Sequence, residues 1–428
     1  MKKGDLKYDA FVQILNEELV PAMGCTEPIS LAFVAAKARE VLGCLPDKVE
    51  VGGSGSIIKN VKSVIVPNTD GMKGMEAAAA IGIVAGNSDK ELEVIADVTK
   101  TQIEEMKDFL KNVPIKVYHQ NSGLVFDIVV KVFKGDSYAM VRVANNHTNI
   151  VHIEKDGEII LDTDPTKGGD ENQTDRTLLT MKDIWEFAHD VDIADVKDLL
   201  DTQIKYNTAI SEEGLKNDWG ANIGSTMIKS YGNDVRTRAK AMAAAGSDAR
   251  MNGCELPVVI NSGSGNQGIT VTMPVVVYAE ELKKSDEERY RALVLSNLIS
   301  VHIKTPIGVL SAYCGAVSAG AGAGAAVTYL LGGGYEDICY AVSNAISAIS
   351  GIVCDGAKSS CAMKIVNGVE AGIFGGDMYK GGNKFEAGEG LVGDDIEGTI
   401  ANVGRLGKDG MEGTNDEIID IMVGTGEN

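Results

Sequence analysis

Residues 305–335 read TPIGVLSAYCGAVSAGAGAGAAVTYLLGGGY, a run of 31 residues without a charged side chain. This run is longer than the ~20 residues that a helix needs to cross a bilayer. However, it consists mostly of Gly, Ala, Ser and Thr, which gain little free energy from lipid, and neither Lys/Arg-rich flanks nor a Trp belt accompanies it. We therefore expect a buried helix whose small residues let neighbouring backbones approach closely.

The chain has 428 residues, a formal net charge of −21 and 44% hydrophobic residues. Because single cores stop growing well below this length, we expect two or three domains. A strongly negative surface repels phosphate backbones and anionic membranes, so we expect a small-molecule substrate, no nucleic acid and no membrane. The chain does not start with the apolar segment of a signal peptide, which predicts a cytoplasmic location. A homodimer is possible.

The fold class predicted from the sequence is α+β. Apolar spacing indicates helices over residues 5–20 and 26–42, and Thr26 is a suitable cap for the second helix. Residues 1–44 should form N-terminal helices that carry Cys25 and pack on the catalytic domain, which we expect at residues 176–428.

Residues 45–175 are predicted to form an α/β domain with a mixed, largely antiparallel sheet. Its expected strands are KVEVG (48–52), SVIVP (63–67), ELEVIADV (91–98), LVFDIVVKVF (124–133) and YAMVRVA (138–144), followed by a hairpin at Asp156-Gly157. Helices are expected at 74–87 and 100–113, and residues 162–175 should form a loop.

Residues 176–428 are predicted to form an all-helical, Gly/Ala-rich catalytic domain. Within them, VVI (258–260) and VVVY (275–278) could be short strands.

Cys25 lies just before a predicted helix. Unpaired backbone N–H groups and the positive end of the helix dipole favour a thiolate there and should lower the pKa of the thiol. An exposed Glu27 would act in the opposite direction. A small residue in a tight turn is the alternative interpretation of Cys25.

Three further polar stretches could bind a ligand. The stretch NSGSGNQG (261–268) exposes successive N–H groups and hydroxyls and can hold a carboxylate or a phosphate, although a plain turn is an alternative. Its candidate binding residues are Ser262, Gly263, Ser264, Asn266 and Gln267. Asn60 and His147 lie in two other polar clusters, although a lone histidine is usually structural.

The stretch CDGAKSSC (354–361) places two thiols near each other, and Cys314 lies forty residues upstream. Thiolates favour zinc, copper or iron–sulfur clusters. The chain lacks the C-x2-4-C pairs of structural zinc sites, and small residues of a packed core are the other interpretation. Three cysteines are also the number that holds a 4Fe-4S cluster and leaves one iron without a protein ligand.

These stretches together resemble the L-cysteine desulfidases, also classed as UPF0597 proteins and distantly similar to the α-chain of iron–sulfur L-serine dehydratases. The resemblance covers nearly the whole chain through PAMGCTEPISLA (21–32), HTNIVHIE (147–154), SDARM (247–251), NSGSGNQGITVTMPVVV (261–277) and IVCDGAKSSCAMK (352–364).

The resemblance implies an oxygen-sensitive 4Fe-4S cluster bound by Cys314, Cys354 and Cys361, with Cys25 as the catalytic base. The implied reaction is β-elimination of L-cysteine to pyruvate, ammonia and hydrogen sulfide, with the open iron as a Lewis acid for the substrate sulfur. As our own hypothesis beside the resemblance, the loop at 262–268, with Asn60 or His147, would hold the substrate carboxylate and ammonium. No role is implied for the remaining cysteines, Cys44, Cys254 and Cys339.

Three alternatives remain open. The same cluster could dehydrate L-serine. A pyridoxal-phosphate lyase could catalyse the same net reaction with Lys59 as its Schiff base. A membrane or small-ligand-binding protein built from Gly/Ala helices is a third possibility.

Overall fold

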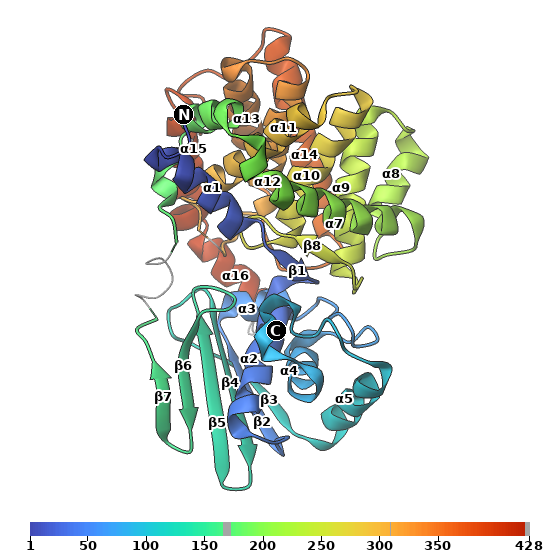
Figure 1. The fold of residues 1–428 in the computed structure, drawn as a ribbon, viewed down its shortest axis with the longest axis vertical. Helices are drawn as coiled ribbons and strands as arrows, with labels where there is room; N and C mark the ends of the chain where they lie inside the picture. Colours follow the sequence, from blue (N-terminus) through green and yellow to red (C-terminus); the bar gives the residue numbers. More distant parts are fainter. Residues whose placement is uncertain (166–172, 309, 424–428) are drawn as a thin grey trace.

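The computed structural model describes residues 1–165, 173–308 and 310–423. Figure 1 shows two parts stacked along the long axis: a lower part built on a β-sheet and an upper part made of packed helices. This arrangement confirms the predicted α+β class. The exact domain limits stay a prediction, and residues 166–172 of the expected loop lie outside the described residues.

The lower part contains the β-sheet and four α-helices. Its elements are α2 (Thr26–Leu42), β2 (Lys48–Gly53), α3 (Gly55–Val61), α4 (Gly74–Ala85), η1 (Ser88–Glu93), α5 (Lys100–Asn112), β3 (Ile115–His119), β4 (Asp127–Lys134), β5 (Ser137–Ala144), β6 (Ile150–Lys155) and β7 (Glu158–Asp162). The six strands follow the order β3-β2-β4-β5-β6-β7, and only the β2–β3 pair is parallel. The predicted mixed, largely antiparallel sheet is therefore confirmed.

Two of the expected strands are wrong. Residues 63–67 form only an isolated bridge, between Ile65 and Lys73, because the chain turns at once after Pro67. Residues 91–98 begin in the 3-10 helix η1 and continue as turns, since the Asn87 side chain accepts the backbone N–H of Asp89 and starts a helical turn. Val64, Val66, Val94 and Ile95 of these stretches are buried, but they fill the core instead of joining the sheet.

The upper part is largely helical. Its elements are α1 (Leu6–Glu18), β1 (Pro21–Met23), η2 (Arg176–Leu178), α6 (Met181–Asp190), η3 (Ile193–Asp195), α7 (Lys197–Lys216), α8 (Ile223–Tyr231), α9 (Val235–Met251), β8 (Pro257–Val259), α10 (Gly265–Glu281), α11 (Asp286–Lys304), α12 (Gly315–Leu330), α13 (Tyr335–Ile349), α14 (Cys361–Lys380), α15 (Ile396–Arg405), η4 (Leu406–Gly410) and α16 (Glu412–Val423).

One short β-pair interrupts this helical part. Strand β8 confirms the expected strand near residues 258–260, and it pairs antiparallel with β1. The other possible strand, 275–278, is wrong because these residues belong to the buried helix α10. Burial on all sides gives β-branched residues a place in a helix as well as in a sheet.

The two N-terminal helices pack in different places. Helix α1 joins the upper core, where the rings of Tyr8 and Phe11 each lie 5.4 Å from the ring of Phe187. Helix α2 instead packs against α4 and strands β4 and β5 of the lower part. The expectation that both helices pack on the helical part is therefore wrong for α2, because the sheet and α4 cover most of its apolar residues.

Helix α12, which the Gly/Ala run forms, lies in the middle of the upper part and contacts α10, α11, α13 and α14. A Cβ atom on Gly320 would lie 2.2 Å from the carbonyl carbon of Gly368, and one on Gly324 would lie 2.1 Å from that of Gly372. Because both contacts advance by four residues, α12 and α14 are parallel and begin at the same end.

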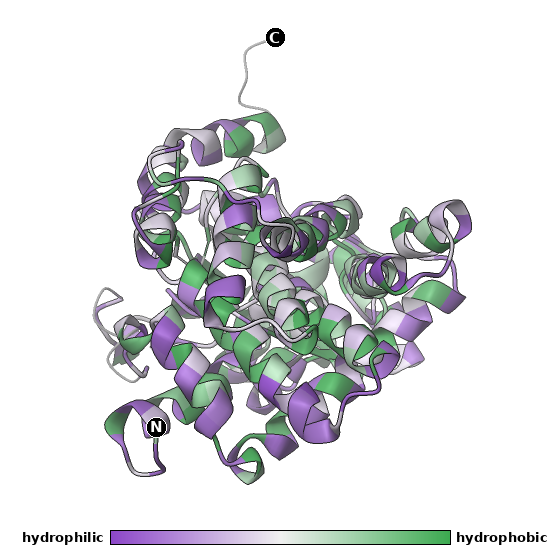
Figure 2. Ribbon diagram, turned by 90° about the horizontal axis from the view of Figure 1, so that it is seen from above, coloured by the Kyte–Doolittle hydropathy of each residue, from purple (hydrophilic) through white to green (hydrophobic). Residues whose placement is uncertain are grey.

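The predicted buried helix is therefore confirmed. Figure 2 shows this part from above, with the hydrophilic residues concentrated on the outer helices. Across residues 1–165, 173–308 and 310–423, no helix combines the length and the apolar character needed to cross a membrane.

The contact between α12 and α14 predicts the effect of adding a methyl group. Gly324→Ala places a Cβ atom inside the backbone of α14, so we expect the free energy of unfolding to fall by about 3 kcal/mol or more. Gly413→Ala in α16 is the matched control, because a Cβ atom there has no neighbour within 4 Å. Urea unfolding of both variants tests this prediction, and equal stability would contradict it.

A buried carboxyl group makes the stability depend on pH. Burial raises the pKa of Asp248 to about 6, although this side chain accepts the N–H of Gly224 at the start of α8. The folded-state pKa exceeds the unfolded value of 3.8, so the folded protein favours the protonated, neutral form of Asp248. The contribution of this form to the free energy of unfolding is complete below about pH 4 and is lost as the pH rises through 6.

We expect Asp248→Asn to remove this loss, which is roughly 3 kcal/mol for a shift of about two pKa units. The measurement is the free energy of unfolding of both proteins in urea between pH 4 and pH 7. A constant difference between the two proteins over that range would contradict the assignment.

Candidate active site

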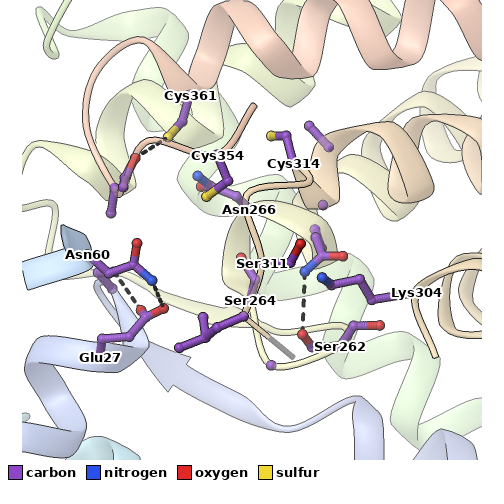
Figure 3. A pocket seen from close by; sticks show the side chains of 18 of the residues that line it. Glu27, Asn60, Ser262, Ser264, Asn266, Lys304, Ser311, Cys314, Cys354 and Cys361 are labelled. Atoms are coloured by element: carbon purple, nitrogen blue, oxygen red, sulfur yellow. Dashed lines mark hydrogen bonds between the residues drawn. The ribbon is translucent and has the colours of Figure 1, made fainter. Parts of the chain in front are cut away.

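A buried cavity lies where the two parts meet. All eleven residues singled out from the sequence line it: Cys25, Asn60, His147, Ser262, Gly263, Ser264, Asn266, Gln267, Cys314, Cys354 and Cys361. Glu27, Arg250, Lys304 and Tyr313 also line the cavity. In Figure 3 the thiols of Cys314, Cys354 and Cys361 occupy one side, and Glu27 and Asn60 lie on the other.

Four helices begin at this cavity. Cys25, Ser264 and Cys314 are the N-caps of α2, α10 and α12, and Cys361 is the first residue of α14. The first N–H groups of a helix lack intrahelical acceptors, and the dipole makes this end positive. The cavity is therefore suited to bind negative charge.

Backbone pairing and helix packing bring the three thiols together. The N–H of Cys314 donates to the carbonyl of Ile352 at 3.1 Å, and the N–H of Cys354 donates to the carbonyl of Ala312 at 2.6 Å. The parallel packing of α12 on α14 places Cys361 at the same end as Cys314. Cysteines that are distant in sequence thus line one cavity.

The 354–361 segment is fixed by charged side chains. The Asp355 carboxylate forms ion pairs with Lys358, at 2.8 Å, and with Lys364. Lys364 also donates to the carbonyl of Val353 at 2.9 Å. These contacts hold the backbone between the two cysteines and place positive charge beside them.

Burial and mutual proximity disfavour free thiolates here. Burial, and then the neighbouring Cys354, raise the pKa of Cys314 to about 12, and burial also raises the pKa of Cys361. Burial lowers the pKa of Lys304 to about 8, although Cys354 and Cys314 oppose this shift. Within the described part of the chain, no three His, Cys, Asp or Glu side chains are grouped closely enough to share one metal ion.

Cys25 is buried against a carboxylate. Its thiol donates to Glu27 Oε2 at 3.0 Å, and only 3% of the residue is exposed. Burial and the charge of Glu27 raise the pKa of Cys25 well above its usual value, against the opposing charge of Arg250. The predicted lowering of this pKa is therefore wrong, because desolvation outweighs the helix N-terminus.

Glu27 is the anionic group of the site. Burial acts to raise its pKa, but His147, the Cys25 thiol, a backbone N–H and Arg250 outweigh burial, so the pKa is lowered. Asn60 Nδ2 donates to Glu27 Oε1 at 2.9 Å, whereas Asn60 Oδ1 is buried without a hydrogen-bond partner. Glu27 is therefore a buried carboxylate at one end of the cavity.

His147 is buried, but one of its ring nitrogens has no hydrogen-bond partner among the described residues. Its ring packs edge-on against Phe126 with the centroids 4.8 Å apart, and its Nε2 atom is buried without a partner. Burial lowers the pKa of His147, although Glu27 opposes the shift. A neutral imidazole with a free nitrogen therefore lines the cavity.

The turn before α10 presents polar groups to the same space. Ser262 and Gly263 have φ values of 48° and 72°, and the flanking residues exchange backbone hydrogen bonds across the turn. Thr26 Oγ1 donates to the carbonyl of Gly263 at 3.1 Å and connects the turn to α2. The side-chain oxygens of Asn266 and Gln267 are buried and unpartnered.

The sequence analysis missed two cationic residues of the site. Arg250 lies near the end of α9, and its guanidinium is buried. Lys304 is the last residue of α11 and is 6% exposed. A single arginine in the Ala-rich stretch AMAAAGSDARM (241–251) was the available signal, because a buried Arg requires an anionic partner.

Lys59 lies outside the cavity wall. Its Nζ atom donates to Asn415 Oδ1 at 2.7 Å and to the carbonyl of Cys354 at 3.3 Å, and burial lowers its pKa. The amine thus connects α3, the 354–361 segment and α16. These contacts do not favour Lys59 as the Schiff base of a pyridoxal-phosphate lyase.

The geometry is that of an enzyme-like site with thiols at one end and a buried carboxylate at the other. A family model described as the serine dehydratase alpha chain matches residues 89–420. The chain therefore belongs to the serine dehydratase alpha-chain family.

Relatives cover almost the whole chain. A UPF0597 protein of Desulfitobacterium hafniense is 57% identical over 99% of this chain and 98% of its own length. A UPF0597 protein of Lachnoclostridium phytofermentans is 49% identical over 97% of this chain and 100% of its own length. One of Fusobacterium nucleatum is 45% identical over 98% of this chain and 99% of its own length. These matches confirm the resemblance to UPF0597 proteins.

Proposed function

We propose that this protein is an L-cysteine desulfidase, which converts L-cysteine and water to pyruvate, ammonia and hydrogen sulfide. The observation that carries the proposal is the presence of three thiols, from two segments far apart in the sequence, in one buried cavity that also contains Cys25. The family match supports a lyase that acts on a β-substituted amino acid.

The donor set fits a 4Fe-4S cluster bound by Cys314, Cys354 and Cys361. Three cysteine thiolates that line one cavity are the number that holds such a cluster while leaving one iron without a protein ligand. Lys304, Lys364 and the N-termini of α12 and α14 supply the positive surroundings that bound thiolates require. When bound, the cluster supplies an open iron, a Lewis acid with affinity for sulfur.

Cys25 takes the α-proton in this proposal. It must first lose its own proton, and Glu27 Oε2, at 3.0 Å from the sulfur, is positioned to accept it. The thiolate then removes the proton from Cα, and the electron pair forms the Cα–Cβ double bond as the Cβ–S bond breaks. Sulfur leaves as hydrogen sulfide, and the 2-aminoacrylate tautomerises and hydrolyses to pyruvate and ammonia.

The remaining residues bind and orient the substrate. The turn at Ser262, Gly263 and Ser264, the amides of Asn266 and Gln267, and Asn60 and His147 all present polar atoms to the cavity. Unpartnered buried polar atoms are rare, so a ligand is expected to satisfy several of them. Fixed orientation lowers the barrier because the Cα–H bond is held near the base.

L-serine dehydration is the second candidate function, and the match to the serine dehydratase alpha chain favours it. Thiol-binding iron favours a sulfur leaving group over a hydroxyl. We therefore propose cysteine as the preferred substrate. The cytoplasmic location and the homodimer stay predictions.

Activity provides the first test. Protein purified without oxygen should release sulfide and pyruvate in equal amounts from L-cysteine, with a higher kcat/KM than for L-serine. Assays of sulfide, pyruvate and ammonia measure the stoichiometry. A visible absorption band that borohydride abolishes would contradict the cluster and support pyridoxal phosphate.

The cysteine variants separate the two proposed roles. Cys314→Ala, Cys354→Ala and Cys361→Ala should each lose most iron and acid-labile sulfide, because a ligand is removed. Cys25→Ala should keep the iron and the visible absorption but lower kcat by at least about 100-fold. Cys254→Ala, which changes a buried thiol outside the cavity, is the matched control.

Full iron content in the three ligand variants would contradict the assignment of Cys314, Cys354 and Cys361 as cluster ligands. Wild-type turnover by Cys25→Ala would remove Cys25 as the base.

A further inference from the structure

Arg250 is a buried cation in the wall of the cavity. Its relative exposure is 2%, and within residues 1–165, 173–308 and 310–423 its side chain forms no hydrogen bond or ion pair, with Nε itself buried and unsatisfied. Burying an unpaired charge costs several kcal/mol, so such a group is normally completed by an anion. Arg250 lines the cavity, which is open to a ligand.

The guanidinium lies against the first turn of α10. A Cβ atom on Gly265 would be 2.3 Å from Arg250 Nε, so only glycine lets the guanidinium reach this position. Gly265, Asn266 and Gln267 have the N–H groups that an α-helix leaves unpaired at its start. A fixed guanidinium beside a helix N-terminus is a suitable site for a planar carboxylate.

A buried carboxylate lies in the same cavity. Glu27 interacts electrostatically with Arg250, but the two groups do not form an ion pair, and the side-chain contacts of Glu27 are with Cys25, Thr26 and Asn60. The cavity thus contains a cation and an anion that do not neutralise each other by direct contact. A zwitterion that lies between them would satisfy both.

We propose that Arg250 and the first turn of α10 bind the α-carboxylate of a free α-amino acid, while Glu27, still a carboxylate at this binding step and before it accepts the Cys25 proton, binds its α-ammonium. This inference rests on the proposed function only for the identity of the side chain that reacts. It assigns the residues that recognise the two charged groups which such a substrate carries on one carbon. An amine can pair only with Glu27, whereas a simple carboxylic acid or an N-blocked amino acid can pair only with Arg250 and the first turn of α10.

The second cation of the cavity has a different position. Lys304 interacts electrostatically with Cys314 and Cys354, the proposed cluster ligands. Arg250 interacts instead with Cys25, Glu27 and His147, at the opposite end. Lys304 therefore balances the thiolates, and Arg250 is the cation available to the carboxylate.

Binding of unreactive ligands to the anaerobic holoprotein tests the inference without turnover. L-Alanine carries both charged groups but no leaving group, whereas ethylamine lacks the carboxylate and propionate lacks the ammonium. By calorimetry, the wild type should bind L-alanine at least about tenfold more tightly than either partial ligand, because each lost charge-assisted hydrogen bond costs affinity.

Arg250→Gln should weaken L-alanine binding at least about tenfold and remove the preference over ethylamine. Arg250→Lys should recover part of that affinity, since lysine restores the positive charge but lacks the planar guanidinium that donates two hydrogen bonds to a carboxylate. Arg238→Gln is the matched control, because Arg238 lies on the same helix but pairs with Glu281 at the surface. Glu27→Gln should remove the preference of L-alanine over propionate.

Iron content and the unfolding midpoint show whether each variant is folded. If Arg250→Gln does not fold, Gly265→Ala replaces it, since its methyl group displaces the guanidinium and should weaken L-alanine binding in the same way. Wild-type affinity in folded Arg250→Gln, or loss of affinity in Lys304→Gln instead, would overturn the inference.

The outcomes distinguish this inference from the proposed function. If the wild type binds L-alanine through Arg250 but releases no sulfide from L-cysteine, the proposed function fails and the zwitterion site stands. If the wild type releases sulfide but Arg250→Gln keeps the wild-type KM for L-cysteine and the wild-type affinity for L-alanine, the function stands and the zwitterion site fails.

Discussion

The backbone contact between α12 and α14 is the constraint on which the rest of the structure depends. Each glycine in a helix interior costs roughly 1 kcal/mol relative to alanine, and α12 contains several of them. That cost is offset because Gly320 and Gly324 let the backbone of α14 approach more closely than any side chain would permit. The parallel register then places Cys314 and Cys361 at the same end, so helix packing determines where the thiols meet.

The electrostatics of the cavity follow from the same arrangement. Four helix N-termini make the region positive, while burial removes the water that would otherwise stabilise free charges. Desolvation therefore decides the protonation of Cys25, Cys314 and Lys304, and the helix dipoles are secondary. Burial of this kind favours neutral thiols, whereas a bound cation or a zwitterionic ligand would shift the balance.

The site exists only where the two parts meet. The lower part contributes Asn60 from α3 and His147 from the loop between β5 and β6, and the upper part contributes Arg250 and the turn before α10. Helix α2 connects them, since its body packs on the sheet while Thr26, at its start, bonds to the turn. Lys59 adds a second connection from α3 to the 354–361 segment. Separation of the two parts would therefore disassemble the site.

The sequence by itself determined the α+β class, the helices at 5–20, 26–42, 74–87 and 100–113, the hairpin at Asp156-Gly157 and eleven of the residues that line the cavity. It could do so because apolar periodicity and turn residues are local signals, and because the matching stretches are long. Local signals were misleading at residues 63–67, 91–98 and 275–278, where β-branched residues fill a core without entering the sheet.

Only the tertiary structure decided the protonation of Cys25, the packing of α2 and the position of Arg250. A pKa depends on burial and on charges brought in from distant segments, and no local pattern encodes them. The packing of α2 was set by which surfaces were available to cover its apolar sides. The same holds for Arg250, which becomes a binding group because Gly265, on the next helix, leaves room for its guanidinium.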